Sequence, residues 1–392
     1  MKITNLIKQL GSREPDGYPF LSIYLNAESN STGREDYQVW LKKRLSEQSQ
    51  SFGSDETGRF DSAVAKINDF LKDADVSSNG IAVFTSLGDE PLFETVELDV
   101  AFSQNQLFAY DRPHIFPLAR AVYQHPRYAV LWADTNKADI YIFDGEDRIR
   151  TDNTAKEKVE TIQNVVTNRT QVGGWAQGRY QRHIDNFHLQ HAKEVVAELE
   201  ELMRKKNIDQ LVLCGDEATI MPVLRPQLSK AVEEKVIAVI NLSQYDSPEE
   251  IHEQALAAVD NENAKSDVEK AEAVNNAAKA AAGMGTLGVE DTLRALANGQ
   301  VQELVLSADL DAIEYSQSKV EKILEEYRPN DEHASVDTSS KDRFAGEIAD
   351  QLILRAIETD ARVILIEDIS LLRDAGGVGS ILRYNTNATA SG

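Results

Sequence analysis

Residues 288–299, GVEDTLRALANG, are followed closely by Glu303-Leu304-Val305-Leu306, which is mostly apolar. The spacing of apolar side chains between the flanking glycines predicts a helix over 289–297, and the run that follows predicts a strand. The same alternation continues downstream, where helices are predicted over 317–327 and 343–357 and a strand over 362–366. The C-terminal third of the chain is therefore expected to be an α/β domain.

A second α/β pattern precedes this region. Apolar residues 128–133 and 139–143 flank a polar turn, which predicts a β-hairpin. Further strands are predicted over 210–215 and 236–240, with a helix from about residue 218 between them. A segment rich in alanine and charged residues, 249–282, predicts a long helix that joins this region to the C-terminal one.

The first 122 residues form a third mixed pattern. Amphipathic periodicity predicts helices over 37–45 and 62–71, with a Ser- and Gln-rich loop over 46–58 between them. Pro113 and Pro117 are expected to break regular structure and to mark a domain boundary. Strands are predicted over 21–25, 81–84 and 92–96. We therefore expect three α/β domains, at 1–122, 123–262 and 263–392.

Composition narrows the class of protein. The chain has 392 residues, 42% of them hydrophobic, but no apolar run reaches the ~18–20 residues that a membrane span needs. The N-terminus lacks the layout of a secretory signal. The single cysteine, Cys214, excludes an intramolecular disulfide framework, and its place at the end of an apolar strand predicts a core residue. A cytoplasmic protein without a membrane partner is expected.

Charge is unevenly distributed. The net charge is −24, from 65 acidic and 41 basic residues, and this argues against general nucleic-acid binding and against DNA as a partner. Between residues 161 and 193, however, the only acidic residue is Asp185. The basic residues of this segment are Arg169, Arg179, Arg182 and Lys193. Contact with a polyanion is therefore expected to be local to this segment.

The basic segment surrounds the sequence Val172-Gly173-Gly174-Trp175-Ala176-Gln177-Gly178. Glycine permits positive φ and close approach to another surface, because it has no Cβ. Glutamine has no proton to exchange near neutral pH, so Gln177 can orient a water molecule but cannot act as a base. Two glycines and one amide, flanked by arginines, suit a loop that enters an RNA-lined cavity.

The C-terminal region resembles a known domain. Its start, residues 288–299 with the strand after them, and its end, Gly376–Tyr384, resemble the two ends of the C-terminal domain of archaeal and eukaryotic class I release factors and Pelota. The order hairpin, Gly-Gly loop, long basic helix, strand, helix, strand is similar to their middle domain. The resemblance covers about residues 125–392. It implies an RNase H-like middle domain and a C-terminal domain like those of kink-turn-binding ribosomal proteins.

Two departures from the family pattern shape the functional expectation. Trp175 and Ala176 separate Gly174 from Gln177, whereas the family has contiguous Gly-Gly-Gln. This Gly-Gly-Trp-x-Gln spacing resembles a bacterial and archaeal branch of release-factor-like proteins, which makes Gly173, Gly174 and Gln177 the candidate catalytic residues. The N-terminal region has no Asn-Ile-Lys-Ser loop and no codon-reading cysteine motif, so rescue or quality control fits better than stop-codon decoding.

The resemblance implies a ribosome-dependent hydrolysis of peptidyl-tRNA, with a translational GTPase as a further partner through the C-terminal domain. Trp175 is expected to stack on a nucleotide base or to pack against its own domain, and Arg179, Arg182 and Lys193 to contact RNA phosphates or to form a solvated helix face. Two alternatives stay open: a tRNA-cleaving factor that uses Arg179, Arg182 and His183, and a non-catalytic module that binds the ribosome or a protein.

No cofactor or metal is expected. His183, His188 and His191 lack an accompanying set of cysteines or carboxylates. Asp134, Asp139 and Asp185 are a weak candidate for a two-metal nuclease site, because two of them lie at or beside the predicted hairpin turn.

Overall fold

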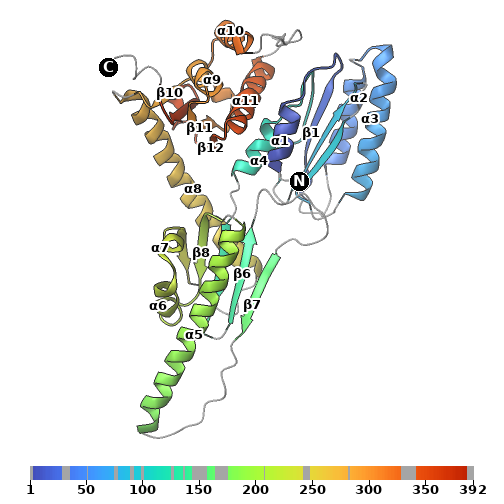
Figure 1. Cartoon of the computed structure of the whole chain (residues 1–392). Coiled ribbons are helices and arrows are strands. Elements are labelled where there is room, and N and C mark those ends of the chain that lie inside the picture. Colours follow the sequence, from blue (N-terminus) through green and yellow to red (C-terminus); the bar gives the residue numbers. More distant parts are fainter. Residues whose placement is uncertain are drawn as a thin grey trace. The chain divides into compact units, whose positions relative to one another are not determined.

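The computed structural model describes residues 3–28, 36–50, 52–74, 78–88, 92–98, 101–124, 128–135, 137–143, 157–163, 175–206, 208–241, 248–280, 283–327 and 341–385. In this part of the chain the fold is mixed α/β, as predicted, with three β-sheets that follow one another along the sequence (Figure 1). The sheets fall within the ranges 1–122, 123–262 and 263–392, whose exact boundaries remain a prediction. The chain divides into two compact units, one combining residues 1–125 with 266–392 and one comprising 126–144 and 152–265.

The first sheet is antiparallel and has the strand order β3-β2-β1-β4. Side chains of β1 alternate between two cores, as the two-residue period of a strand requires. Phe20 and Tyr24 share a core with α1 and α4, whereas Leu21, Ile23 and Leu25 share one with α2 and α3. The elements are α1 (Ile3–Gly11), β1 (Phe20–Asn26), α2 (Tyr37–Ser49), α3 (Ser54–Asp73), β2 (Gly80–Ser86), β3 (Phe93–Leu98), β4 (Gln106–Tyr110) and α4 (Phe116–Gln124).

Helices α2 and α3 are longer than the sequence predicts. The expected loop over 46–58 is wrong over most of its length, because α2 continues to Ser49 and α3 begins at Ser54. Glu56 stabilises the start of α3, since its carboxylate accepts a hydrogen bond of 3.0 Å from the backbone N–H of Gly53. The polar composition of this segment therefore belongs to solvated helix ends.

The third sheet belongs to the same unit and has the order β10-β13-β11-β12, in which only β11 and β12 are parallel. Helices α9, α10 and α11 pack on one face of this sheet and share a core with α1 and α4. The other face packs against Ala271 and Val274 of α8. The elements are α8 (Pro248–Lys279), β10 (Gly285–Leu287), α9 (Val289–Ala297), β11 (Val301–Ser307), α10 (Gln317–Tyr327), α11 (Lys341–Glu358), β12 (Arg362–Ile366) and β13 (Val378–Leu382).

A buried carboxylate on α11 joins the two parts of this unit. Asp350 accepts hydrogen bonds from the backbone N–H groups of Ile115 (3.0 Å) and Phe116 (2.7 Å), and its second oxygen lies 2.7 Å from Nδ1 of His114. The N–H groups at the start of a helix have no intrahelical partner. Asp350 therefore caps α4 from a position 235 residues away from Ile115 in the chain. Gly346 leaves room for this contact, because a Cβ there would lie 2.9 Å from Cε1 of His114.

Pro117 does not interrupt regular structure, contrary to the sequence-based expectation. It lies in the first turn of α4, where a missing N–H removes no intrahelical hydrogen bond. The next residues, Leu118 and Ala119, are fully buried in the core of the first unit. The segment around Pro117 is thus part of a packed helix.

The second unit contains a five-stranded sheet of order β7-β6-β5-β8-β9. Strands β5 and β6 form the predicted hairpin, and β5, β8 and β9 are parallel. Helix α5 covers one face, and Ala255 and Val259 of α8 pack on the other. The elements are β5 (Tyr128–Ala133), β6 (Lys137–Phe143), β7 (Glu157–Gln163), α5 (Trp175–Lys206), β8 (Gln210–Cys214), α6 (Met221–Leu224), α7 (Lys230–Glu233) and β9 (Val236–Ile240).

Cys214 at the end of β8 is buried, as predicted, and burial raises the pKa of its thiol to about 12. It is therefore a protonated core residue. No helix in the described part of the chain is long and apolar enough to cross a membrane.

Candidate functional site

Helix α5 begins at Trp175, directly after the two glycines of the candidate loop. Gly173 and Gly174 lie outside the described residues, so their predicted role is not tested. The expectation that Gln177 sits in a loop is wrong for the backbone, which is helical from Trp175 onward. Alanine, glutamine and arginine are good helix formers, and a single glycine at 178 does not end the helix.

The N-terminal half of α5, called its free half below, extends past the end of the sheet of its unit (Figure 1). The first buried residues of the helix among those with described side chains are His191 and Ala192. Between them and residue 185 the side chains are exposed or half-buried, including Phe187, which is 40% exposed. Since a helix rises about 1.5 Å per residue, Gln177 lies about 22 Å beyond Ala192 along the axis. Figure 1 shows α5 continuing past the end of its sheet.

The sequence along α5 makes its free end basic. Arg179 and Arg182 lie in its first turns, and the first turn contains no acidic residue. The unpaired N–H groups of a helix N-terminus add a partial positive charge. Lys193 lies on the same helix and is exposed. The predicted RNA-binding residues Trp175, Arg179, Arg182 and Lys193 are therefore carried by one element whose start is electropositive, a charge that suits phosphate groups.

The buried histidine His191 marks the point at which α5 meets the core. It is 1% exposed, and its ring lies beside the backbone of Lys137 without a hydrogen bond of good geometry to any described residue. Burial lowers the pKa of His191, because the charged form loses hydration, and the nearby carboxylates of Asp134 and Glu194 oppose this shift. A neutral imidazole is therefore packed at the base of the free half of α5.

The acidic residues of the β5–β6 hairpin have structural partners. The carboxylate of Asp134 accepts a hydrogen bond of 2.6 Å from the backbone N–H of Lys137, which closes the turn. The Lys137 ammonium lies 2.7 Å from the buried carboxylate of Asp139 and 5.4 Å from the ring centroid of Trp132. These contacts assign Asp134 and Asp139 to the turn. Within the described residues, no three His, Cys, Asp or Glu side chains come together as a metal site.

The side chains of His183 and Asp185 lie outside the described part of the chain, so the histidine and aspartate sets of the sequence analysis are only partly visible. Among the described members, His188 and His191 are close enough to influence one another electrostatically. Sequence reasoning did not predict that His191 is buried. Its spacing with Val195 and Leu199, on one helix face, is the signal that indicates this.

Comparison with known proteins finds one matching family model and several similar solved structures. Residues 113–260 match the model of bacterial archaeo-eukaryotic release factor family 10, a range that spans less than half of the chain. No curated protein matches the chain. Among solved structures, an archaeal translation termination factor, aRF1, is 15% identical over 97% of both chains, with a TM-score of 0.27.

Two quality-control factors are also similar. A model of ribosome-bound archaeal Pelota and ABCE1 is 15% identical over 78% of both chains, with a TM-score of 0.43. The S. cerevisiae protein Dom34, described as a translation termination-like factor in RNA quality control pathways that interacts with Hbs1, is 10% identical over 80% of this chain and 81% of its own, with a TM-score of 0.37.

The match to a release-factor family is thus limited to one segment of the chain. Its segment 113–260, which carries the second unit up to residue 260 and with it the whole of α5, matches family 10 of the bacterial branch.

Proposed function

We propose that the protein acts on the ribosome in translation rescue or quality control, in the cytoplasm, and hydrolyses peptidyl-tRNA. The observation that carries this proposal is the free half of α5. It lies within the segment that matches a release-factor family, it begins directly after Gly173 and Gly174, and it carries Gln177 about 22 Å beyond the core. A projecting helix suits a protein whose reaction takes place inside a cavity of the ribosome.

In the proposed reaction, water attacks the carbonyl carbon of the ester that joins the peptide to the tRNA ribose. The ester C–O bond breaks, the peptide leaves as a carboxylic acid, and the ribose oxygen takes a proton from the attacking water. Gly173 and Gly174 allow close approach of the backbone. Gln177 holds the water or, through a backbone N–H, stabilises the oxyanion that develops on the carbonyl oxygen. Gly173, Gly174 and Gln177 include no base at neutral pH. Ribosomal RNA and the tRNA itself therefore supply most of the rate enhancement, and the isolated protein is nearly inactive.

The test is release of peptide from stalled ribosomes that carry labelled peptidyl-tRNA. Gln177→Ala is expected to reduce the release rate by about 10²-fold or more, the loss typical for one group that stabilises an oxyanion. Gln181→Ala removes the same side chain one turn further along α5 and is expected to leave the rate within about twofold of wild type. Equal activity of wild type and Gln177→Ala sinks the hydrolytic proposal.

A second candidate function is cleavage of the tRNA, because Arg179, Arg182 and His183 follow Gln177 in the same helix. Sizing the tRNA on a denaturing gel separates the two reactions: hydrolysis leaves the 3′ end intact, whereas cleavage shortens it. A ribosome-bound protein with neither product is a binding module. In that case Arg179→Gln and Arg182→Gln together weaken binding, while Gln177→Ala has no effect.

A GTPase partner through the C-terminal region is part of the same proposal. Dom34, one of the similar proteins, is described as interacting with Hbs1.

A further inference from the structure

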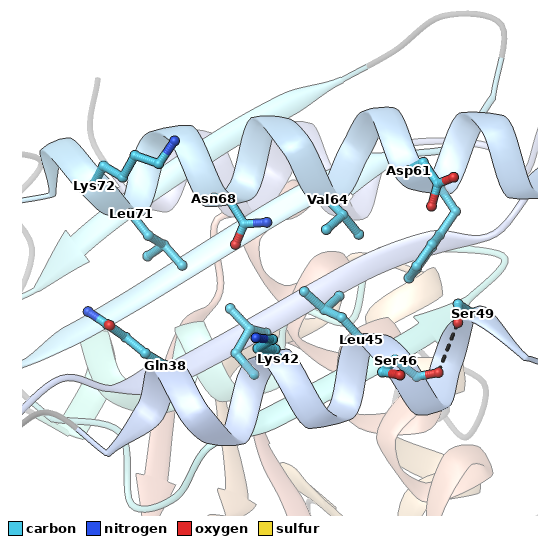
Figure 2. A pocket seen from close by; sticks show the side chains of 12 residues that line it. Gln38, Lys42, Leu45, Ser46, Ser49, Asp61, Val64, Asn68, Leu71 and Lys72 are labelled. Atoms are coloured by element: carbon cyan, nitrogen blue, oxygen red, sulfur yellow. Dashed lines mark hydrogen bonds between the residues drawn. The ribbon is translucent and has the colours of Figure 1, made fainter.

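Helices α2 and α3 lie on one face of the first sheet and leave a groove of about 880 Å³ between them. The two helices run in opposite directions along the groove, so that Gln38 faces Leu71 at one end and Ser49 faces Asp61 at the other (Figure 2). Its walls are aliphatic, with Leu41 and Leu45 contributed by α2 and Val64 and Leu71 by α3. Val64 and Leu71 are half-buried, and nothing in the described part of the chain covers the groove between the two helices.

The dimensions of the groove fit a third helix. The lining residues span 38–49 on α2 and 60–72 on α3, which correspond to about 17 Å and about 18 Å of helix axis. This length equals about three turns. Packed helices normally lie 8–10 Å apart with interdigitated side chains, and the open volume here shows that α2 and α3 do not fill the space between them. Aliphatic walls with a polar rim are the features that bind the apolar face of an amphipathic helix.

Charge on the rim selects the occupant. Lys42 is exposed and forms no ion pair within the described residues, and Lys72 pairs with Asp69 at 2.8 Å in a contact that leaves both side chains more than 70% exposed. Such surface pairs contribute little, so an incoming carboxylate can displace Asp69. Both lysines lie toward the Gln38 end of the groove, and Asp61 lies toward the other (Figure 2). The lining of this end contains these two lysines and no carboxylate.

Two other occupants fit less well. A second copy of the chain would bring its own Lys42, Lys43 and Arg44 against the same basic rim, and like charges would repel. A single-stranded nucleic acid would need aromatic platforms for its bases, whereas the only aromatic residue in the lining, Phe60, is 2% exposed.

We propose that the groove between α2 and α3 is a docking site for a three-turn amphipathic helix of another protein. The bound helix presents aliphatic or aromatic anchors at i, i+4 and i+7 to the walls formed by Leu41, Leu45, Val64 and Leu71. It places Asp or Glu side chains over Lys42 and Lys72. This interaction is independent of the chemistry at α5, and its failure would leave the proposed hydrolysis untouched.

The probe is a phage-displayed library of helical peptides of about 16 residues, selected against the full chain. Selected peptides are expected to share the apolar i, i+4, i+7 spacing and a cluster of acidic residues at one end. Their affinities are then measured by fluorescence anisotropy. Val64→Asp, and separately the double variant Lys42→Glu with Lys72→Glu, are each expected to weaken binding about tenfold or more. Lys66→Glu, an exposed charge on α3 outside the groove, is the matched control and is expected to change affinity less than about twofold.

A reciprocal change sharpens the test. Peptides with their acidic residues replaced by lysine are expected to bind the double variant better than they bind wild type. Circular dichroism melting establishes that the Val64→Asp protein is folded; if it is not, the double variant and its reciprocal peptide decide. The proposal is overturned if no peptide is selected, or if the selected peptides bind the groove variants as tightly as wild type. It is also overturned if Val64→Asp abolishes self-association in sedimentation velocity, or if the double variant abolishes binding of a single-stranded RNA oligonucleotide.

Discussion

At the residue scale, Asp350 concentrates several interactions in one carboxylate. It is 8% exposed, accepts hydrogen bonds from two backbone N–H groups at the start of α4 and contacts the His114 ring. Hydrogen bonds to a charged group contribute more than neutral ones, and removing one partner leaves the others buried without a replacement. The stability of the first unit therefore depends on this single side chain more than on any exposed ion pair.

Asp350→Ala is expected to lower the free energy of unfolding by about 3 kcal/mol, because it leaves two N–H groups and the His114 ring unpaired in the core. Urea denaturation followed by circular dichroism measures the difference. Asp374→Ala, which removes an exposed carboxylate of the same unit, is the control and is expected to change stability by less than about 0.5 kcal/mol. Equal effects of the two substitutions would show that Asp350 does not cap α4.

At the element scale, α5 combines a packed half and a free half. The boundary at His191 is sensitive to pH. A histidine whose pKa is lowered by folding is neutral in the native state, while the unfolded chain binds a proton below its ordinary pKa of about 6.5. The contribution of this group to stability is therefore complete above that pH and is lost as the pH falls through it.

We expect hydrogen exchange of the α5 amides, measured by mass spectrometry, to be faster at pH 5 than at pH 7.5 after correction for the intrinsic rate. His191→Phe keeps an aromatic ring of similar size without a titrating group, so it should reduce this pH dependence. His188→Phe, one turn earlier and half-buried, serves as the matched variant and should retain it. A His191→Phe protein with the full wild-type pH dependence would contradict the assignment.

The elements also show what the sequence could and could not predict. The hairpin of β5 and β6 and the helices α9 and α10 were predictable, because apolar periodicity defines them locally and flanking glycines also bound α9. Strand β7, EKVETIQ, was missed, since a charged strand that pairs only with β6 lacks a clear apolar pattern. Strand β10 was missed because it has three residues and depends on pairing with β13.

The candidate site was only partly predictable for a related reason. Composition located the basic segment around Gly173 and Gly174, but it did not show that Gln177 lies in a helix or where α5 leaves the core. That point is set by packing of Ala192 and Val195 against the sheet, which is a tertiary effect. Likewise, nothing local to Ile115 indicates that its N–H group bonds to Asp350.

At the scale of the whole molecule, the acidic net charge repels RNA phosphates, whereas the basic start of α5 attracts them. Ribosome binding through α5 should weaken as salt rises, because each phosphate contact releases counterions. We expect co-sedimentation with ribosomes to lose affinity with a log–log slope of about −2 to −3 in KCl if Arg179, Arg182 and Lys193 each contact one phosphate.

Replacing these three residues by Gln should make that slope shallower by about 2 to 3. Arg204, Lys205 and Lys206 occupy the last turn of the same helix, and their replacement by Gln removes the same charge. This control variant should keep the wild-type slope. If both triple variants shift the slope equally, the attraction is to the overall charge and the start of α5 is not the contact.

The division of the first unit between the two ends of the chain has a consequence for biosynthesis. Residues 126–144 and 152–265 are complete and can fold as the second unit before the C-terminal part of the first unit has been synthesised. The ribosome adds Asp350 to the growing chain 236 residues after His114. At typical elongation rates this is a delay of roughly 10–50 s. During that interval α4 lacks the Asp350 cap, and its apolar face is not yet covered by the C-terminal part of the unit. We therefore expect the nascent chain to need a chaperone most during this interval.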